Sequence, residues 1–362
     1  MQNSKKELDQ ARLQILQAEV NGRLETYWAE LPAHFSLDLS PHGLQALDYL
    51  REFSLRPGKR LRAVLAMTAY EMFGGRDHDV ALDLAVVMEL TQSYLLIVDD
   101  VMDQSERRRG GPTLQVQYRA VLDGPMDDTA VRDHNANMLG VNVGLLAQHL
   151  AASVLNSLAE APARVLRAER LYHANVAATG FGQIDDLFQT ATREGGVADT
   201  LHMYALKSAY YTFINPLQMG AALAGANEAA LERLHTFGLR AGLAFQLHDD
   251  LLGMFGDDRQ TGKSVLDDLR EGKMTVLIRH ALEHGSSVEK DVILQALGNP
   301  QLKMAEHRQV QKLLIKLGTR GHAQKLAERE VASALDVLHA QTAWPKDLAI
   351  WLEDLLRYVV AE

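Results

Sequence analysis

The chain of 362 residues contains no cysteine. Disulfide bridges and thiolate metal sites are therefore excluded, and such a composition is typical of a reducing compartment. No uninterrupted apolar run approaches the roughly 18 residues that a membrane span requires. The N-terminus, MQNSKKELDQ, lacks the apolar core of a signal peptide. We therefore expect a soluble, cytoplasmic protein without a transmembrane segment.

Positive charge is also scarce. Lys and Arg number 37 against 47 Asp and Glu, which gives a formal net charge of −10. Proteins that bind nucleic acid usually present a basic face, so we expect no nucleic-acid partner. Local basic clusters in such a chain indicate pockets rather than a general positive field.

Strand-like alternation is absent over any length, whereas apolar residues recur every three or four positions along most of the chain. This spacing predicts helices of roughly 10–25 residues, which end where Gly, Pro and Asp gather. Such breaks occur at 56–59, 108–113, 122–128 and 193–199. No long linker interrupts the pattern, so the sequence predicts an all-α protein with one large domain over residues 1–362.

The first unusual motif is DDVMD at 99–103, which ends an apolar segment that we predict to be helical over 82–103. Asp99 and Asp103 share a helix face, and Asp100 lies about 100° away. Carboxylates so close repel one another unless a cation lies between them. Oxygen ligands favour Mg²⁺, with Mn²⁺ as an alternative, over Zn²⁺. The competing interpretation is a solvated helix end that forms ion pairs with Arg107–Arg109.

A second acid pair, Asp249 and Asp250, ends another apolar segment about 150 residues later. The position four beyond Asp249 is Gly253, and further acids follow at 257 and 258. If the two helices pack side by side, the acid pairs face one another across a cavity and could hold a diphosphate through Mg²⁺. The competing interpretation is a helix end that runs into a polar loop.

Two basic clusters accompany the acidic motifs. RPGKRLR places Lys59, Arg60 and Arg62 where a helix begins, and exposed N–H groups beside cations form a good anion site. Arg108 and Arg109 form the second cluster, and arginine matches phosphate oxygens with two parallel hydrogen bonds. The competing interpretation of each cluster is a solvated face.

Five motifs in order along the chain resemble those of the trans-prenyltransferases, or polyprenyl diphosphate synthases. The motifs are GKRLR at 58–62, ELTQSYLLIVDDVMDQSERRRGGPT at 89–113, GFGQIDDL at 180–187, LKSAYYTFINPLQMGAALAGA at 206–226, and FQLHDDLLGMFGD with TGKSVLDDLREGK at 245–273. This resemblance implies about a dozen helices around a deep cavity (the isoprenoid synthase type I fold), usually as a homodimer. It also implies a Mg²⁺-dependent reaction that joins an allylic diphosphate to isopentenyl diphosphate.

The resemblance further implies roles for individual residues. The metal ligands would be Asp99, Asp100 and Asp103 on one side of the allylic diphosphate and Asp249 and Asp250 on the other. Contacts to the same diphosphate would come from Arg108, Lys207, Lys263 and Lys273. Isopentenyl diphosphate would be bound by Lys59, Arg62, Gln92 and Arg109. The residues near the reacting carbons would be Ser208 and Gln246.

The residues before Asp99 bear on product length. In the family that this chain resembles, a bulky aromatic residue five positions before the first acid closes the product tunnel, and here Tyr94 and Leu95 occupy that region. The pattern resembles geranylgeranyl (C20) diphosphate synthases, with farnesyl (C15) and geranylfarnesyl (C25) synthases as alternatives. Gly253 departs from the family's second motif, which usually carries a third acid there.

Two other functions share parts of this pattern. A class I terpene cyclase needs no isopentenyl diphosphate site, and the presence of Lys59, Arg62 and Arg109 argues against it. A non-catalytic partner subunit would be expected to have lost the first acidic motif, which is intact here. His280 and His284 lie four apart without the Glu of an HExxH metal site, so we interpret them as surface residues.

Overall fold

The computed structural model describes residues 2–34, 38–256 and 264–360, and the chain divides into two compact units, residues 1–169 and 170–362. Helices make up nearly all the regular structure of the described residues. The all-α class predicted from the sequence is therefore confirmed. Each unit is described by itself, and the single domain expected over 1–362 stays a prediction.

The first unit consists of helices and one short β-hairpin. Side chains set several helix starts, because Ser40, Asp77 and Asp128 accept hydrogen bonds from the first free backbone N–H groups of α2, α4 and α6. The elements are α1 (Gln2–His34), α2 (Pro41–Leu55), α3 (Leu61–Met72), α4 (His78–Met102), β1 (Arg107–Arg108), β2 (Gly111–Pro112), α5 (Leu114–Leu122) and α6 (Thr129–Asn156).

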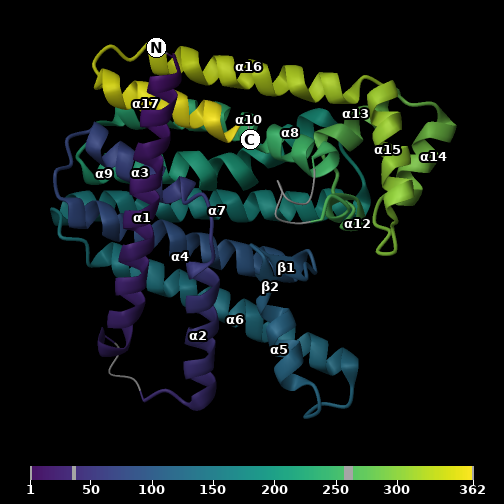
Figure 1. Cartoon of the computed structure of the whole chain (residues 1–362), viewed down its shortest axis with the longest axis horizontal. Helices are drawn as coiled ribbons and strands as arrows, with labels where there is room; N and C mark the ends of the chain where they lie inside the picture. Colours follow the sequence, from purple (N-terminus) through teal and green to yellow (C-terminus); the bar gives the residue numbers. More distant parts are fainter. Residues whose placement is uncertain (1, 35–37, 257–263, 361–362) are drawn as a thin grey trace. The chain divides into compact units, whose positions relative to one another are not determined.

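Helix α4 forms the core of this unit. Its residues from 84 to 93 are all buried, and it packs against α3 and α6 (Figure 1). A helix that is apolar nearly all round belongs in the interior. The predicted helix over 82–103 is confirmed, and Asp103 is the residue that caps its C-terminus.

Within the part of the chain that the structure describes, two helices, α4 and α6, are long and apolar enough to cross a membrane by length and composition. In the most apolar stretch of each, 72% of α4 is buried but only 39% of α6. The composition of α4 thus reflects its place in the core of the first unit. Helix α6 differs, because large apolar side chains such as Met138 and Leu145 remain exposed on it.

The second unit is helical throughout its described residues, and α16 lies along α10 (Figure 1). Asn227 caps the N-terminus of α10, and Thr275 caps that of α13. The elements are α7 (Pro162–Thr192), which begins in the first unit, α8 (Val197–Tyr204), η1 (Ala205–Ile214), α9 (Asn215–Leu223), α10 (Glu228–Phe255), α12 (Asp267–Arg270), α13 (Val276–His284), α14 (Ser287–Ala296), α15 (Met304–Lys316), α16 (Thr319–His339) and α17 (Lys346–Val359).

A ten-residue π-helix, η1, connects α8 to α9. Helices α7 and α10 approach it closely at glycines, because a Cβ on Gly182 would overlap the Lys207 backbone and one on Gly242 would overlap Ala209. π-Helical turns are rare and occur frequently at functional sites. Here the π-helix carries Lys207 and Ser208, two of the predicted site residues.

Candidate active site

The first acidic motif ends helix α4, and Arg108 of the β-hairpin lies against it. Asp100 is fully buried, and its Oδ1 atom accepts a 2.7 Å hydrogen bond from Arg108 Nε. Arg108 Nη2 also lies 2.5 Å from the same oxygen and 3.5 Å from Asp99 Oδ2. The ion pairing considered from the sequence therefore does occur, through Arg108.

Burial dominates the electrostatics of this acid cluster. It raises the pKa of Asp100 to about 6, even though Arg108 acts in the opposite direction. The charges of Asp99 and Asp103 raise this pKa further. One arginine thus does not neutralise the cluster, and a further cation would favour its ionised form.

The segment at 56–60 and the β-hairpin at 107–112 lie together, although about 50 residues separate them in sequence. Arg56 donates 2.9 Å and 2.8 Å hydrogen bonds to the carbonyl oxygens of Arg108 and Pro112. A Cβ on Gly58 would lie 3.3 Å from the guanidinium carbon of Arg109. The structure therefore gathers the two basic clusters of the first unit, with Lys59 exposed beside them.

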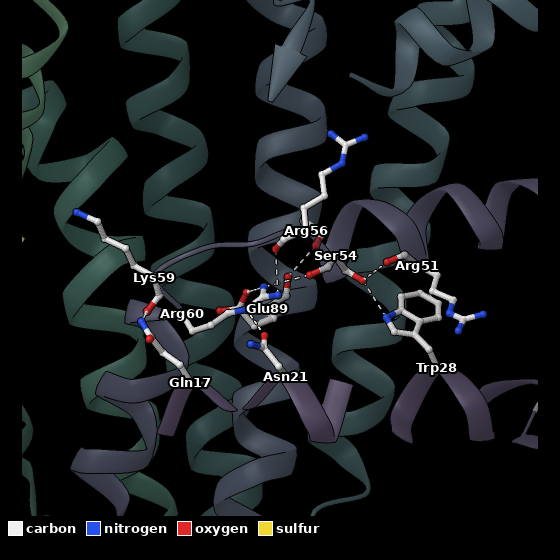
Figure 2. A network of polar contacts seen from close by, with 10 residues as sticks. Gln17, Asn21, Trp28, Arg51, Ser54, Arg56, Lys59, Arg60 and Glu89 are labelled. Atoms are coloured by element: carbon white, nitrogen blue, oxygen red, sulfur yellow. Dashed lines mark hydrogen bonds and ion pairs between the residues drawn. The ribbon is translucent and has the colours of Figure 1, made fainter. Parts of the chain in front are cut away.

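Arg60, in contrast, is part of the interior. Its backbone has a φ of 50°, and its Nη1 atom lies 2.6 Å from Glu89 Oε2. It also donates hydrogen bonds to Asn21 and to the carbonyl oxygens of Ser54 and Arg56, in the network of Figure 2. The interpretation of Arg60 as part of an exposed anion site was therefore wrong. It anchors the segment instead, and the Lys59 side chain points away from this network (Figure 2).

The other predicted residues of the first unit lie along α3 and α4. Arg62 is half-buried in the first turn of α3, and Gln92 is buried on α4. Tyr94 and Leu95 are half-buried one turn before the acids. Helix α6 comes close to this turn, because a Cβ on Gly144 would lie 3.5 Å from the Tyr94 carbonyl oxygen.

The second acidic motif lies near the C-terminal end of α10, where a chain of polar side chains holds Asp250. Gln246 Nε2 donates a 2.9 Å hydrogen bond to Asp250 Oδ1. The Tyr204 hydroxyl donates a hydrogen bond to the other carboxylate oxygen, Oδ2. Ser208 Oγ in turn donates a 2.6 Å hydrogen bond to Gln246 Oε1. Three of the predicted site residues, Ser208, Gln246 and Asp250, are thus joined in one chain, whereas Asp249 is exposed.

Asp250 is buried among these partners. Burial raises its pKa to about 8, although the hydrogen bonds from Tyr204 and Gln246 lower it. The charges of Asp268 and Asp249 raise it further. As at Asp100, a cation bound nearby would favour the ionised form.

The predicted cations of the second unit have acidic neighbours. Lys207 Nζ lies 2.6 Å from Asp186 Oδ2 on α7, so the motif at 180–187 meets the π-helix. Lys273 Nζ lies 2.8 Å from Glu271 Oε2. Lys263, like the acids at 257 and 258, lies outside the described residues.

Two residues around the second acidic motif, Asp186 and Tyr204, were missed in the sequence interpretation. Asp186 lies within a recognised motif, so that motif was a signal for it. Tyr204 gave no signal, because a tyrosine at the end of an amphipathic helix is typical of an ordinary core residue. Its contact with Asp250 arises only from the packing of α8 beside α10.

The donor sets fit Mg²⁺. Among the residues that the structure describes, no group of three or more His, Asp or Glu side chains could hold a metal by itself. Mg²⁺ needs only one or two carboxylates, since water and substrate phosphates complete its shell. Asp100 Oδ2 is buried and has no hydrogen-bond partner in the described part of the chain. An oxygen of this kind is a suitable ligand for a hard cation.

The acid sets belong to different units, with Asp99, Asp100 and Asp103 in the first and Asp249 and Asp250 in the second. Each set lies at the C-terminal end of a largely buried helix, as the sequence predicts. That the two sets face one another across a cavity stays a prediction.

Comparison with known proteins gives a consistent result. The family model described as polyprenyl synthetase matches residues 44–314. The chain is 30% identical over 282 residues to the geranylgeranyl diphosphate synthase of Sulfolobus acidocaldarius, covering 78% of this chain and 80% of that protein. It is 31% identical over 310 residues to the geranylfarnesyl diphosphate synthase of Aeropyrum pernix, covering 84% and 90%.

A solved structure agrees with these sequence matches. It is the geranylgeranyl pyrophosphate synthase from Corynebacterium glutamicum complexed with isoprenyl diphosphate and magnesium. That chain is 26% identical, with a TM-score of 0.88 and coverage of 94% of this chain and 97% of that one. The chain therefore belongs to the polyprenyl synthetase family, and it is a trans-prenyltransferase.

Proposed function

We propose that this enzyme joins an allylic diphosphate to isopentenyl diphosphate with the help of Mg²⁺. The observation that carries the proposal is the same in both units. Each places a buried carboxylate, Asp100 or Asp250, near the C-terminal end of a largely buried helix. A cation accompanies each motif, because Arg108 pairs with Asp100 in the first unit and Lys207 precedes Ser208 of the hydrogen-bonded chain to Asp250 in the second.

In the first unit, Asp99, Asp100 and Asp103 would hold Mg²⁺ and through it the allylic diphosphate. Bound Mg²⁺ would supply Lewis-acid stabilisation of the diphosphate as a leaving group. Arg108 already lies beside Asp99 and Asp100. It is therefore placed to contact the same diphosphate and to stabilise the negative charge that develops on it.

In the second unit, Asp249 and Asp250 would act on the same diphosphate. Lys207 and Lys273, with Lys263, would add positive charge. Tyr204 and Gln246 fix both oxygens of Asp250, and Ser208 fixes Gln246. We place Ser208 and Gln246 near the reacting carbons, where their mutual hydrogen bond keeps both polar groups satisfied. Polar groups that are already paired do not need water as a partner, and a carbocation reaction requires that water be excluded.

We assign isopentenyl diphosphate to the basic residues beside the hairpin. Arg109 lies against Gly58, and the neighbouring Lys59 is exposed. Arg62 and Gln92 complete the proposed set. The buried Arg60 holds the segment in place without contacting the substrate.

We propose a C20 product, with Tyr94 and Leu95 at the floor of the tunnel. Their half-buried position one turn before Asp99 supports this assignment. The C20 synthase of S. acidocaldarius and the C25 synthase of A. pernix are similarly related to this chain. If the main product were C25 or C15 instead, residues other than Tyr94 and Leu95 would close the product tunnel.

We also propose that the enzyme is a cytoplasmic homodimer. On α7, Phe181, Ile184 and Phe188 follow at spacings of three and four and thus share a helix face. The two phenylalanines are 64% and 66% exposed. Exposed apolar patches of this kind mark interaction sites, and a second copy of the chain would cover this one.

The dimer is tested by light scattering after gel filtration. We expect the wild-type protein to elute as a dimer and the Phe181→Asp/Phe188→Asp variant as a monomer. Val288, which is 73% exposed on α14, offers a matched control. Val288→Asp should remain dimeric, and a dimeric Phe181→Asp/Phe188→Asp variant would place the interface elsewhere.

The reaction is tested by incubating the purified protein with Mg²⁺, isopentenyl diphosphate and each of the C5, C10 and C15 allylic diphosphates. We expect C20 diphosphate as the main product, and a loss of rate of about 10²-fold or more in Asp100→Asn and Asp250→Asn. A hydrocarbon formed without isopentenyl diphosphate would indicate a terpene cyclase. Absence of elongation with every primer would refute the proposal and favour a partner-subunit role.

A further inference from the structure

Gly253 marks the position on α10 where the sequence lacks a third acid. A carboxylate from another element fills the space beside it. A Cβ on Gly253 would overlap Asp268 Oδ2 and would lie 3.3 Å from Asp268 Cγ. The Asp268 carboxylate thus occupies the volume that a side chain at position 253 would take, one turn after Asp249.

The core holds Asp268 in this place. Helix α12, which carries it, packs against α10. Met254 and Leu269, the neighbours of the two positions, are 3% and 1% exposed and belong to the same apolar cluster. Because the residues next to Gly253 and to Asp268 pack in the same apolar cluster, the Asp268 carboxylate is held in a fixed position beside Gly253.

The neighbouring Asp267 has a different role. Its Oδ2 atom accepts a 3.1 Å hydrogen bond from Ser264 N and so stabilises the turn before α12. Asp268, in contrast, turns its carboxylate toward Gly253, one helical turn after Asp249 on α10. The two neighbouring acids of α12 thus have different partners.

We propose that Asp268 supplies the third carboxylate of the second acidic motif in place of Gly253, and binds the Mg²⁺–diphosphate there directly or through a metal-bound water. This inference rests on the proposed function and deepens it. It accounts for the glycine, since any side chain at 253 would displace the Asp268 carboxylate. Few protein carboxylates and some water ligands are typical of Mg²⁺ sites.

The test measures binding rather than turnover. Inorganic pyrophosphate is titrated by calorimetry into the full-length protein at a series of Mg²⁺ concentrations. We expect Asp268→Asn to weaken Mg²⁺-dependent pyrophosphate binding about tenfold or more, the size found for residues that support metal ligands. Asp267→Asn is the matched control, and its binding should stay near that of the wild-type protein.

An exchange variant separates a lost ligand from a damaged fold. Gly253→Asp alone should lower the melting temperature, because the new side chain would overlap Asp268. Asp268→Gly alone should lose affinity. The double variant Gly253→Asp/Asp268→Gly carries the acid on α10 instead of α12, so we expect most of the affinity to return. No gain over Asp268→Gly would overturn the inference.

The two levels of the proposal fail differently. If the wild-type protein neither elongates a primer nor binds pyrophosphate with Mg²⁺, the proposed function fails. If the wild-type protein does both and the Asp268→Asn variant binds as tightly, only the role of Asp268 fails. Circular dichroism and melting of each variant without Mg²⁺ identify any loss of affinity that comes from misfolding.

Discussion

The Arg60 guanidinium and the Glu89 carboxylate form an ion pair of 2.6 Å in which the two side chains are 1% and 0% exposed. It joins the start of α3 to the middle of α4. The pair thereby fixes the segment that carries Lys59 (Figure 2).

Breaking this pair should destabilise the protein. We expect Glu89→Gln to lower the free energy of unfolding by about 3–5 kcal/mol, because Arg60 would be left as a buried charge without its counter-ion. Urea unfolding of the full chain measures the effect. The exposed pair Arg12–Glu71, at 3.0 Å, provides the control. Glu71→Gln should cost less than about 1 kcal/mol, and equal costs for the two variants would contradict the prediction.

Tyr204→Phe should affect both stability and metal use. The tyrosine hydroxyl donates to Asp250 and accepts a 3.1 Å hydrogen bond from Val276 N. Phenylalanine leaves both buried groups unsatisfied, at a cost of about 1–3 kcal/mol each.

The same substitution removes a hydrogen bond that lowers the pKa of Asp250. The carboxylate should therefore be harder to ionise, and half-maximal activity should require more Mg²⁺. Tyr210→Phe, on the π-helix that follows α8, removes only a 3.3 Å contact with His235 and serves as the control. An unchanged Mg²⁺ requirement for Tyr204→Phe would show that this hydrogen bond does not prepare Asp250 for metal.

Tyr94→Ala should lengthen the product, because the ring would no longer close the tunnel one turn before Asp99. Chromatography of the dephosphorylated products with a C15 primer provides the measurement. Leu96→Ala, two positions further along α4, is the control and should leave the length unchanged. If Tyr94→Ala makes the same product as the wild-type enzyme, Tyr94 is a packing residue and not the floor.

A stack of three histidines should make stability depend on pH. His280 stacks on His284 and on His322, with ring centroids 4.1 Å and 4.2 Å apart. Burial and the neighbouring histidines lower the pKa of His280 and of His322. Below about pH 6.5 the unfolded chain binds more protons than the folded protein, so stability falls as the pH falls.

Thermal melting at pH 7.5 and at pH 5.5 measures this effect. We expect the fall in melting temperature to be smaller in His322→Gln than in the wild-type protein. The exposed His202 belongs to the same unit, and His202→Gln should behave like the wild-type protein. An unchanged pH dependence in His322→Gln would exclude the stack as its source.

The sequence could predict the helices and the motif residues because both depend on short-range spacing. Apolar residues at helical intervals predict α4 and α10. Acids that follow these apolar segments are therefore expected near the C-terminal ends of the helices. Ser208, Gln246 and Asp250 were each predicted as site residues, and hydrogen bonds of 2.6 Å and 2.9 Å join them in the structure.

Other features depend on backbone detail and tertiary packing, which spacing does not encode. Arg60 adopts a φ of 50° and lies in the interior, so the adjacent cations Lys59 and Arg60 do not share one exposed surface. Asp268 meets Gly253 only because α12 packs on α10. The π-helix leaves no signal in the apolar pattern that distinguishes it from an α-helix.

The π-helix at Ala205–Ile214 has a consequence for variation in this family. An α-helix turns by about 100° per residue. Deleting one residue here would let the segment relax to the ordinary repeat without breaking the helix. The rotation lost with that residue and the tighter winding of the others act in opposite directions, so α8 and α9 can keep their orientation while the side chains between them are rearranged. Relatives with a one-residue gap in this segment should therefore keep the tyrosine that contacts Asp250 and differ in the residues between 205 and 214.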